Sequence, residues 1–218
     1  MISGVVFDLD GTLIDSAEAA SITMSNTLRE LGYSVQPSEI RKYIGLTSSE
    51  IASKFMGNLT NDDIKKIKGI RKRNYIKNID KIRVFPDAIS CISNLAKMGI
   101  KVSIASSMGK DLIDEIVKHF NINKMVCCWV SSEEVKNPKP EPDVFLKAFE
   151  RMNLTPRNCI SVGDREYDII AGKKAGSLTA LIIRDQFSKS GTVKPDYEMH
   201  DLNELAIIVS RINSIVQY

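Results

Sequence analysis

The chain has 218 residues, of which 43% are hydrophobic and 26% are charged, with a formal net charge of +3. This composition is ordinary for a folded globular protein, and the charge is too small to indicate a nucleic acid or a membrane surface as a partner. No apolar run approaches the roughly 18–20 residues that span a bilayer, and the first residues lack the pattern of a secretory signal.

The first predicted strand, residues 3–7, is a short run rich in valine and isoleucine, and only helices follow it for a long stretch. Residues 16–31 form the first of these helices, and the capping-box patterns that begin at Thr47 and Thr60 open two more. No strand pattern occurs between residues 16 and 81. We therefore expect an α-helical cap at 16–81, with linkers near 15–16 and 80–86.

Beyond the predicted cap, helices and strands alternate to the end of the chain. The apolar runs are continuous rather than alternating, which is typical of strands buried on both faces of a parallel sheet. This pattern predicts an α/β fold, a Rossmann-like, mostly parallel sheet flanked by helices. Its core would comprise residues 1–15 and 82–218. The predicted strands are 101–105, 125–130, 158–162 and 178–183, and the predicted helices are 86–98, 111–120, 142–152, 167–175 and 201–215.

Two acidic residues, Asp8 and Asp10, follow the first strand directly and precede Gly11. Residues two apart on a strand point to the same side, so both carboxylates would enter one site. Two negative charges this close need a cation beside them, or one of them must take a proton. An acidic strand end followed by an ordinary Asp-Gly turn is the alternative interpretation of this segment.

The ends of the second and third core strands carry candidate groups for binding phosphate. Ser106 and Ser107 follow the strand at 101–105, and a small hydroxyl there can donate to a phosphate oxygen. Lys139 lies among three prolines that stiffen the loop after the third strand and limit where its ammonium can reach. Lys136 is a nearby alternative for the same role, and plain surface loops would also explain both segments.

The fourth of these strand ends supplies two more carboxylates, Asp164 just past the strand and Asp168 four residues later at the start of a helix. A helix N-terminus favours acids for electrostatic reasons alone, which explains Asp168 better than Asp164. In open parallel sheets, ligands bind beyond the carboxyl ends of the strands. Carboxylates, a lysine and hydroxyls converging there are a hard-oxygen environment that favours Mg²⁺.

These four motifs together resemble those of the haloacid dehalogenase-like superfamily, in the branch with a helical cap after the first strand and similar in layout to phosphoglycolate phosphatases. The similarity covers essentially the whole chain and rests on DLDGT, the serine after a buried strand, KPEPD and GDREYD. It implies a phosphatase in which Asp8 is the nucleophile, forming an aspartyl phosphate, and Asp10 is the general acid and base.

The resemblance also assigns the remaining groups of the site. Ser106, with Ser107 beside it, and Lys139 would bind the phosphoryl oxygens. Mg²⁺ would be bound by the carboxylates of Asp8 and Asp164 and the carbonyl of Asp10, and Asp168 would support the metal directly or through water. The implied substrate is a small phosphorylated metabolite of the phosphoglycolate kind.

Sugar-phosphate mutases related to β-phosphoglucomutase are the alternative function. They tend to carry Glu-Asp where this chain has Gly163-Asp164, and an arginine in the cap loop near Ser48. These two departures favour a hydrolase. The resemblance places the loop at residues 45–49 over the active site, which makes it the expected specificity element, while residues 165–167 would contact the substrate, contact the cap or merely cover the helix start.

The segment 61–83 holds nine lysines and arginines against three aspartates. Because isoleucines recur at 64, 67 and 70, we expect them to be buried and most of the basic residues to face solvent, although attraction of anionic substrates is the alternative. The spacing of the four cysteines is not that of a zinc site, and we expect reduced core thiols in a cytoplasmic protein, either monomer or homodimer. The cysteines are Cys91, Cys127, Cys128 and Cys159.

Overall fold

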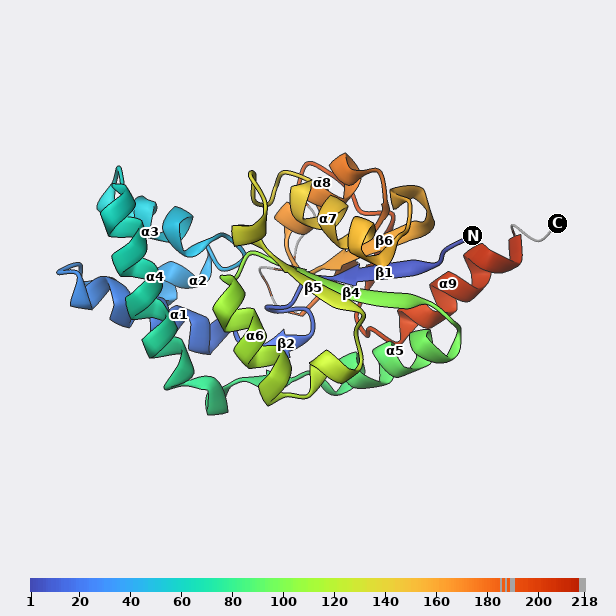
Figure 1. Cartoon of the computed structure of the whole chain (residues 1–218), viewed down its shortest axis with the longest axis horizontal. Coiled ribbons are helices and arrows are strands. Elements are labelled where there is room, and N and C mark those ends of the chain that lie inside the picture. The colour runs from blue at the N-terminus through green and yellow to red at the C-terminus, as the bar shows by residue number, and fades with distance from the viewer. Residues whose placement is uncertain (185, 187, 189–190, 216–218) are drawn as a thin grey trace.

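The structure is a computed structural model that describes residues 1–184, 186, 188 and 191–215. Six parallel strands form its central sheet, in the order β5-β4-β1-β6-β7-β8 (Figure 1). The first strand along the chain is therefore central, and later strands add on either side of it. The strands are β1 (Gly4–Phe7), β4 (Lys101–Ser106), β5 (Cys128–Ser131), β6 (Cys159–Gly163), β7 (Leu178–Ile182) and β8 (Tyr197–Met199).

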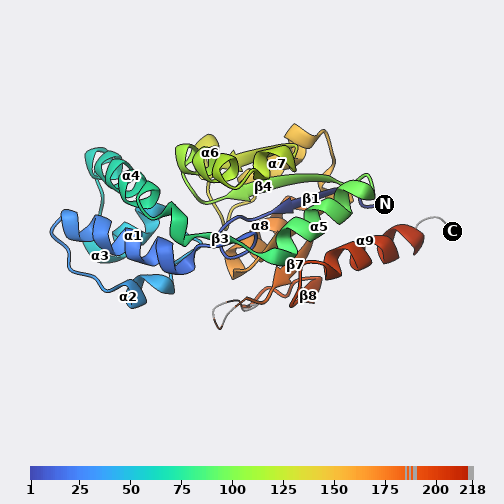
Figure 2. The same cartoon turned by 90° about the horizontal axis from the view of Figure 1, so that it is seen from below.

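Helices cover both faces of the sheet, which explains why the strands are apolar throughout. Val6 of β1 packs with α7 and α8 on one face, whereas Val5 and Phe7 pack into the larger apolar cluster with α5, α6 and α9 on the other. Figures 1 and 2 show these two helical layers. The helices are α5 (Pro86–Lys97), α6 (Lys110–His119), α7 (Asp143–Met152), α8 (Glu166–Ala175) and α9 (Glu204–Ile215).

Four helices between β1 and β4 form a group of their own at one end of the sheet, here called the helical insert. In Figures 1 and 2 this group lies at the opposite end of the molecule from both chain termini. The capping boxes expected at Thr47 and Thr60 are present and start α3 and α4. The helices are α1 (Ala17–Glu30), α2 (Pro37–Arg41), α3 (Ser48–Met56) and α4 (Asn61–Ile76).

A two-stranded antiparallel ribbon joins the insert to the core. Its strands are β2 (Ile14–Asp15) and β3 (Arg83–Val84), with Ile14 opposite Val84 and Asp15 opposite Arg83. The chain thus enters and leaves the insert at one place. The ribbon coincides with the linkers expected from the sequence, while the division into a separate cap and core stays a prediction.

The α/β class with a parallel, helix-covered sheet is confirmed, with differences at several element ends. β5 begins at Cys128 rather than at residue 125, because a short 3-10 helix (Ile122–Lys124) still occupies the chain before it. The strand β8, at the edge of the sheet, was not predicted, since its sequence contains no apolar run. None of the helices within the described residues is long and apolar enough to cross a membrane.

All four cysteines are free thiols, but the expectation that all are core residues was wrong. Cys91 and Cys159 are buried, whereas Cys128 is half-buried and Cys127 is exposed. Cys127 lies in the loop that precedes β5, where the chain has not yet entered the sheet. Burial raises the pKa of the Cys91 and Cys159 thiols to about 12, which leaves both protonated at neutral pH.

Candidate active site

The end of β1 places Asp8 against a buried lysine. The Lys139 ammonium donates to Asp8 Oδ1 at 2.7 Å, to Asp168 Oδ1 at 2.7 Å and to the Ala105 carbonyl at 2.8 Å. Lys139 is only 2% exposed, so its three donors are all used inside the protein. Burial lowers its pKa, but the two carboxylates raise it more, and the net shift is upward. Lys139 is therefore a fixed positive charge in this site.

Burial raises the pKa of Asp8 to about 7, although the charge of Lys139 acts in the opposite direction. The nearby carboxylates of Asp168 and Asp10 contribute to this rise. Burial and the repulsion from these two acids together outweigh the effect of Lys139. The site consequently favours an additional cation.

The turn after β6 brings Asp164 and Asp168 to the same point. Asp168 Oδ2 accepts from the Arg165 backbone N–H at 3.1 Å, as a cap of α8, while its other oxygen bonds Lys139. Asp168 therefore acts both as the helix cap that its position suggests and as part of the charged cluster. Asp164 is buried, and its Oδ2 lies 3.0 Å from Arg165 Nε.

Glycines make the close packing of these acids possible. A Cβ on Gly11 would lie 2.4 Å from Asp164 Oδ2, and Gly11 has φ +79°, a conformation that disfavours side chains. A Cβ on Gly163 would lie 2.2 Å from the Asp168 Cβ. Both loops that carry acids therefore require glycine where they approach each other.

The three acids fit a metal ion by their chemistry and their arrangement. Asp8, Asp164 and Asp168 are all buried, and each offers a carboxylate oxygen within 4.8 Å of the others. Hard oxygen donors of this kind suit a divalent cation such as Mg²⁺, which usually takes few protein carboxylates and keeps several waters. The side chain of Asp10 is not part of this group; only its carbonyl was predicted as a ligand.

The Asp10 carboxylate has hydrogen-bond partners that differ from those of Asp8, and two of them lie outside β1. Its Oδ1 accepts from Ser16 Oγ at 2.5 Å and from the Tyr75 hydroxyl of α4 at 3.3 Å. Burial raises the pKa of Asp10, although Ser16, Arg71 and Tyr75 act against that rise. A carboxyl group with a raised pKa is suited to giving and taking a proton.

A small cavity lies beside these two aspartates. Asp8 and Asp10 line it from the core, Ser48 and Arg71 line it from the insert, and Ser107 lines it from the loop after β4. Ser106 is not among the described residues that border this cavity. It is buried, and its hydroxyl accepts a hydrogen bond from the Met108 backbone N–H at 3.1 Å. Ser107 therefore lies on the same cavity as Asp8 and Asp10, and the role of either serine in binding phosphate stays a prediction.

The sequence profile of the haloacid dehalogenase-like hydrolases matches residues 5–182. The chain belongs to this family. It is therefore a hydrolase, and the phosphoglycolate phosphatase-like resemblance seen in the sequence is confirmed.

Relatives of this hydrolase match it over nearly its whole length. A phosphoglycolate phosphatase of Aquifex aeolicus is 28% identical over 216 residues, 98% of this chain and 99% of that protein. The pyrophosphatase PpaX of Bacillus mycoides is 26% identical over 216 residues, 97% and 99% of the two chains. The crystal structure of β-phosphoglucomutase from Clostridium difficile superposes with a TM-score of 0.84 at 20% identity, covering both chains completely, which shows a shared fold.

Three residues that contact the site of this hydrolase were not singled out from the sequence. The sequence indicates Ser16 only as a domain boundary, and Arg71 and Tyr75 only as part of a helix. The buried positions of α4 are Ile67, Arg71, Asn74 and Tyr75, so the expectation that the isoleucines at 64 and 70 are also buried was wrong. Ile67, Arg71 and Tyr75 are successively four residues apart and so share one face of the helix. This spacing is the sequence signal from which the burial of Arg71 and Tyr75 could have been predicted. The loop expected to confer specificity does approach the site, since a Cβ on Gly45 would lie 3.1 Å from Arg165 Cγ.

Proposed function

We propose that this chain is a Mg²⁺-dependent phosphatase that hydrolyses small phosphate monoesters through an aspartyl phosphate on Asp8. The observation that carries the proposal is the pair of aspartates after one strand, the buried Asp8 and the half-buried Asp10, each in a different environment. Asp8 is held by Lys139, whereas Asp10 is held by neutral hydroxyls. The first arrangement suits an anionic nucleophile and the second suits a proton carrier.

Two displacements at phosphorus follow from these roles. In the first, an Asp8 carboxylate oxygen bonds to phosphorus, the bond to the ester oxygen breaks, and Asp10 gives that oxygen its proton. In the second, Asp10 takes a proton from water, the water oxygen bonds to phosphorus, and the bond to Asp8 breaks. Lys139 and the Ser107 loop would hold the phosphoryl oxygens and offset their charge in both steps.

Asp8 and Asp164 would bind Mg²⁺, together with the Asp10 carbonyl, and Asp168 would support it directly or through water. When bound, the ion would supply positive charge that stabilises the phosphoryl oxygens as they are transferred. The donor set favours Mg²⁺ over Ca²⁺, because a small number of protein oxygens suits an ion that retains water. Comparing activity with Mg²⁺ and with Ca²⁺ therefore tests the metal assignment separately from the nucleophile.

The experiment measures free phosphate released from a panel of phosphate esters with Mg²⁺, with Ca²⁺ and with chelator. We expect turnover only with Mg²⁺ and none in Asp8→Asn, whose amide is a poor nucleophile of the same size. Asp15→Asn, which changes an exposed aspartate of β2, is the control and should keep wild-type activity. Full activity in chelator would overturn the metal assignment, and an active Asp8→Asn would overturn the nucleophile.

A phosphoryl-transfer mutase remains the second candidate, because one observation favours it. The cap loop has Ser48 where mutases tend to have arginine, but the Arg71 guanidinium reaches this place from α4 and donates from Nη1 to Ser48 Oγ at 2.8 Å. Phosphorus NMR of sugar phosphates separates the two functions. A mutase would convert one ester into another without free phosphate, whereas the phosphatase proposed here releases phosphate from each substrate that it turns over.

A further inference from the structure

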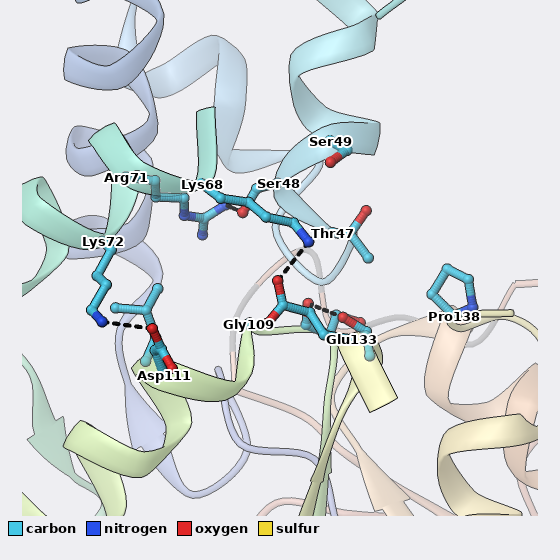
Figure 3. A pocket seen from close by; sticks show the side chains of 14 residues that line it. Thr47, Ser48, Ser49, Lys68, Arg71, Lys72, Gly109, Asp111, Glu133 and Pro138 are labelled. Carbon is cyan, nitrogen blue, oxygen red and sulfur yellow. Dashed lines mark hydrogen bonds and ion pairs between the residues drawn. The ribbon is translucent and has the colours of Figure 1, made fainter. Parts of the chain in front are cut away.

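A larger cavity, of about 340 Å³, lies between the helical insert and the core. Figure 3 shows it bordered by α3 and α4 from the insert, and by the start of α6 and the segment after β5 from the core. It shares Ser48, Arg71 and Ser107 with the small cavity that Asp8 and Asp10 line. Its volume is in the range of sites for small molecules, about 300–1,000 Å³. The larger cavity thus offers space for the part of a substrate beyond the scissile bond.

Three basic residues of α4 face this cavity, Lys68, Arg71 and Lys72, spaced so that they share one face of the helix. Lys68 Nζ lies 2.6 Å from a carboxylate oxygen of Glu133, and Lys72 Nζ lies 2.6 Å from one of Asp111. Figure 3 shows both lysines reaching from the insert to acids of the core. Their charges are therefore already paired across the cavity.

Arg71 differs from its neighbours in both burial and pairing. It is 8% exposed, and the ion pairs recorded for the described part of the chain do not include it. Nη1 donates to Ser48 Oγ at 2.8 Å, a neutral partner, and Nε is buried without a hydrogen-bond acceptor among the described residues. A buried guanidinium costs free energy unless an anion compensates it. Burial lowers the pKa of Arg71, and although the charges of Tyr75 and Asp10 raise it, the net shift is downward. Asp10 thus compensates the buried guanidinium only in part, and Arg71 can accept a further anion.

We propose that Arg71 recognises an anionic group on the leaving group, an inference that rests on the proposed function. The preferred substrates would then carry a carboxylate or a second phosphate beyond the scissile bond. The reacting phosphoryl group would lie at Asp8 and the leaving group in the larger cavity, with Arg71 lining both. A planar guanidinium suits either anion, because carboxylate and phosphate both accept two parallel hydrogen bonds.

The test compares substrates that differ in the leaving group alone. Phosphoglycolate carries a carboxylate and pyrophosphate a second phosphate, whereas ethyl phosphate replaces the carboxylate of phosphoglycolate with a methyl group. For each, kcat/KM is measured with Mg²⁺ in the wild type, in Arg71→Gln and in Arg71→Lys. Lys65→Gln, an equal loss of charge on the exposed side of α4, is the matched control.

We expect the wild type to prefer at least one anionic leaving group over ethyl phosphate, and Arg71→Gln to reduce that preference by about tenfold or more. Arg71→Lys should retain part of it and Lys65→Gln all of it. Whichever of phosphoglycolate and pyrophosphate shows the larger loss identifies the anion. An unchanged preference in Arg71→Gln with a retained melting temperature, or no preference in the wild type, would overturn the proposal and leave Arg71 as a structural partner of Ser48.

A binding measurement separates this inference from the proposed function. Calorimetry in the Asp8→Asn background compares phosphoglycolate and pyrophosphate with ethyl phosphate, with and without Arg71→Gln. If the wild type releases no phosphate from any ester, the proposed function fails, but tighter binding of an anionic ligand that depends on Arg71 would still support the inference. Equal binding of all three compounds, with Arg71 or without it, would overturn the inference while leaving any measured phosphatase activity intact.

Discussion

Lys139 is the buried positive charge that links the acids of this site. Its ammonium lies between Asp8 and Asp168 and also bonds the Ala105 carbonyl at the end of β4, so it connects three segments that are distant in sequence. The sequence alone left Lys136 as an alternative. The structure separates them, since Lys136 is exposed and Lys139 is buried.

The two lysines give a matched pair of substitutions. Lys139→Met should abolish phosphate release and lower the free energy of unfolding by about 3 kcal/mol or more, because it leaves two acids buried without their cation. Lys136→Met makes the same change three residues away and should alter neither quantity. Denaturant unfolding and phosphate release measure both effects. A stable, active Lys139→Met would show that the buried acids do not need this charge.

Gly11 sets the spacing between the first and fourth motifs. Gly11→Ala combines a strained φ with a contact at 2.4 Å to Asp164 Oδ2, whereas Gly57→Ala has nearly the same φ, +78°, and no atom within 4 Å. Gly57→Ala should cost only the backbone strain, about 1–2 kcal/mol. Gly11→Ala should cost more and should also weaken Mg²⁺ affinity, because Asp164 must move.

Thermal unfolding with and without Mg²⁺ measures both the loss of stability and the change in Mg²⁺ affinity. In the wild type and in Gly57→Ala, Mg²⁺ should raise the melting temperature by the same amount, and in Gly11→Ala by less. Equal responses in the two variants would mean that the Asp164 carboxylate can shift without loss of the metal site.

At the scale of elements, a half-buried ion pair joins the end of β7 to the start of α5. Arg184 donates from Nη1 and Nη2 to the two oxygens of Asp87 at 2.8 and 2.9 Å, and stacks over the Phe85 ring at 3.9 Å. It also donates to the Thr12 carbonyl at 3.1 Å, in the turn that follows Asp10. The pair thus supports the turn that directly follows Asp10.

Asp87→Asn should lower the free energy of unfolding at neutral pH by about 1–3 kcal/mol, the range for hydrogen bonds to charged groups. Burial raises the pKa of Asp87, but Arg184 and the Leu202 backbone N–H lower it more, and the net shift is downward. A lowered pKa in the folded state stabilises the protein above the unfolded pKa of about 3.9 and ceases to do so as the pH falls through the folded value.

The wild type and Asp87→Asn should therefore differ most in stability near pH 7, and their unfolding curves should converge as the pH falls below about 4. Urea unfolding across this range measures the difference, with the exposed Asp62→Asn as a control that should show little of it. A difference that stays constant with pH would mean that Asp87 contributes through packing rather than charge.

The sequence predicted those features of the structure that a local pattern of residues determines. The strands of the buried sheet were found because burial on both faces leaves continuous apolar runs, and Thr47 and Thr60 were found because a capping box is a local motif. The inner face of α4 was misjudged. The isoleucines at 64, 67 and 70 suggested an apolar row, but the helix buries Arg71 and Tyr75, whose partners belong to other segments. The sequence likewise could not rank Ser106 and Ser107, because the turn after β4 decides which hydroxyl borders the cavity, and their role in phosphate binding stays a prediction.

At the scale of the whole molecule, the insert and the core meet through charges on either side of the larger cavity. The pair Lys72–Asp111 joins α4 to α6, and the pair Lys68–Glu133 joins α4 to the segment after β5. Both lysines are about half exposed, so each pair contributes little to stability and is weakened by salt. Weak contacts of this kind would allow the insert and the core to separate and admit substrate.

Reversing one of these pairs tests whether they hold the two parts together during turnover. Lys72→Asp should lower kcat/KM for ethyl phosphate by about two- to fivefold at low salt, as expected for the loss of an exposed pair and the gain of a repulsion. The combined variant Lys72→Asp/Asp111→Lys restores opposite charges and should recover most of the loss. If the double variant is no better than the single one, the pair does not govern closure.

The place of β1 in the sheet has a consequence for synthesis of the chain. Gly4 pairs with Lys101 on one side and with Cys159 on the other, 97 and 155 residues further on (101 − 4 and 159 − 4). At about 5–20 residues per second, the ribosome needs several seconds to make the first of these partners, and β1 waits without either. The helices of the insert depend on nearer contacts, and their formation brings Asp15 beside Arg83. Early folding of the insert would therefore shorten the loop that separates β1 from β4, so that β1 joins the sheet soon after its neighbour emerges.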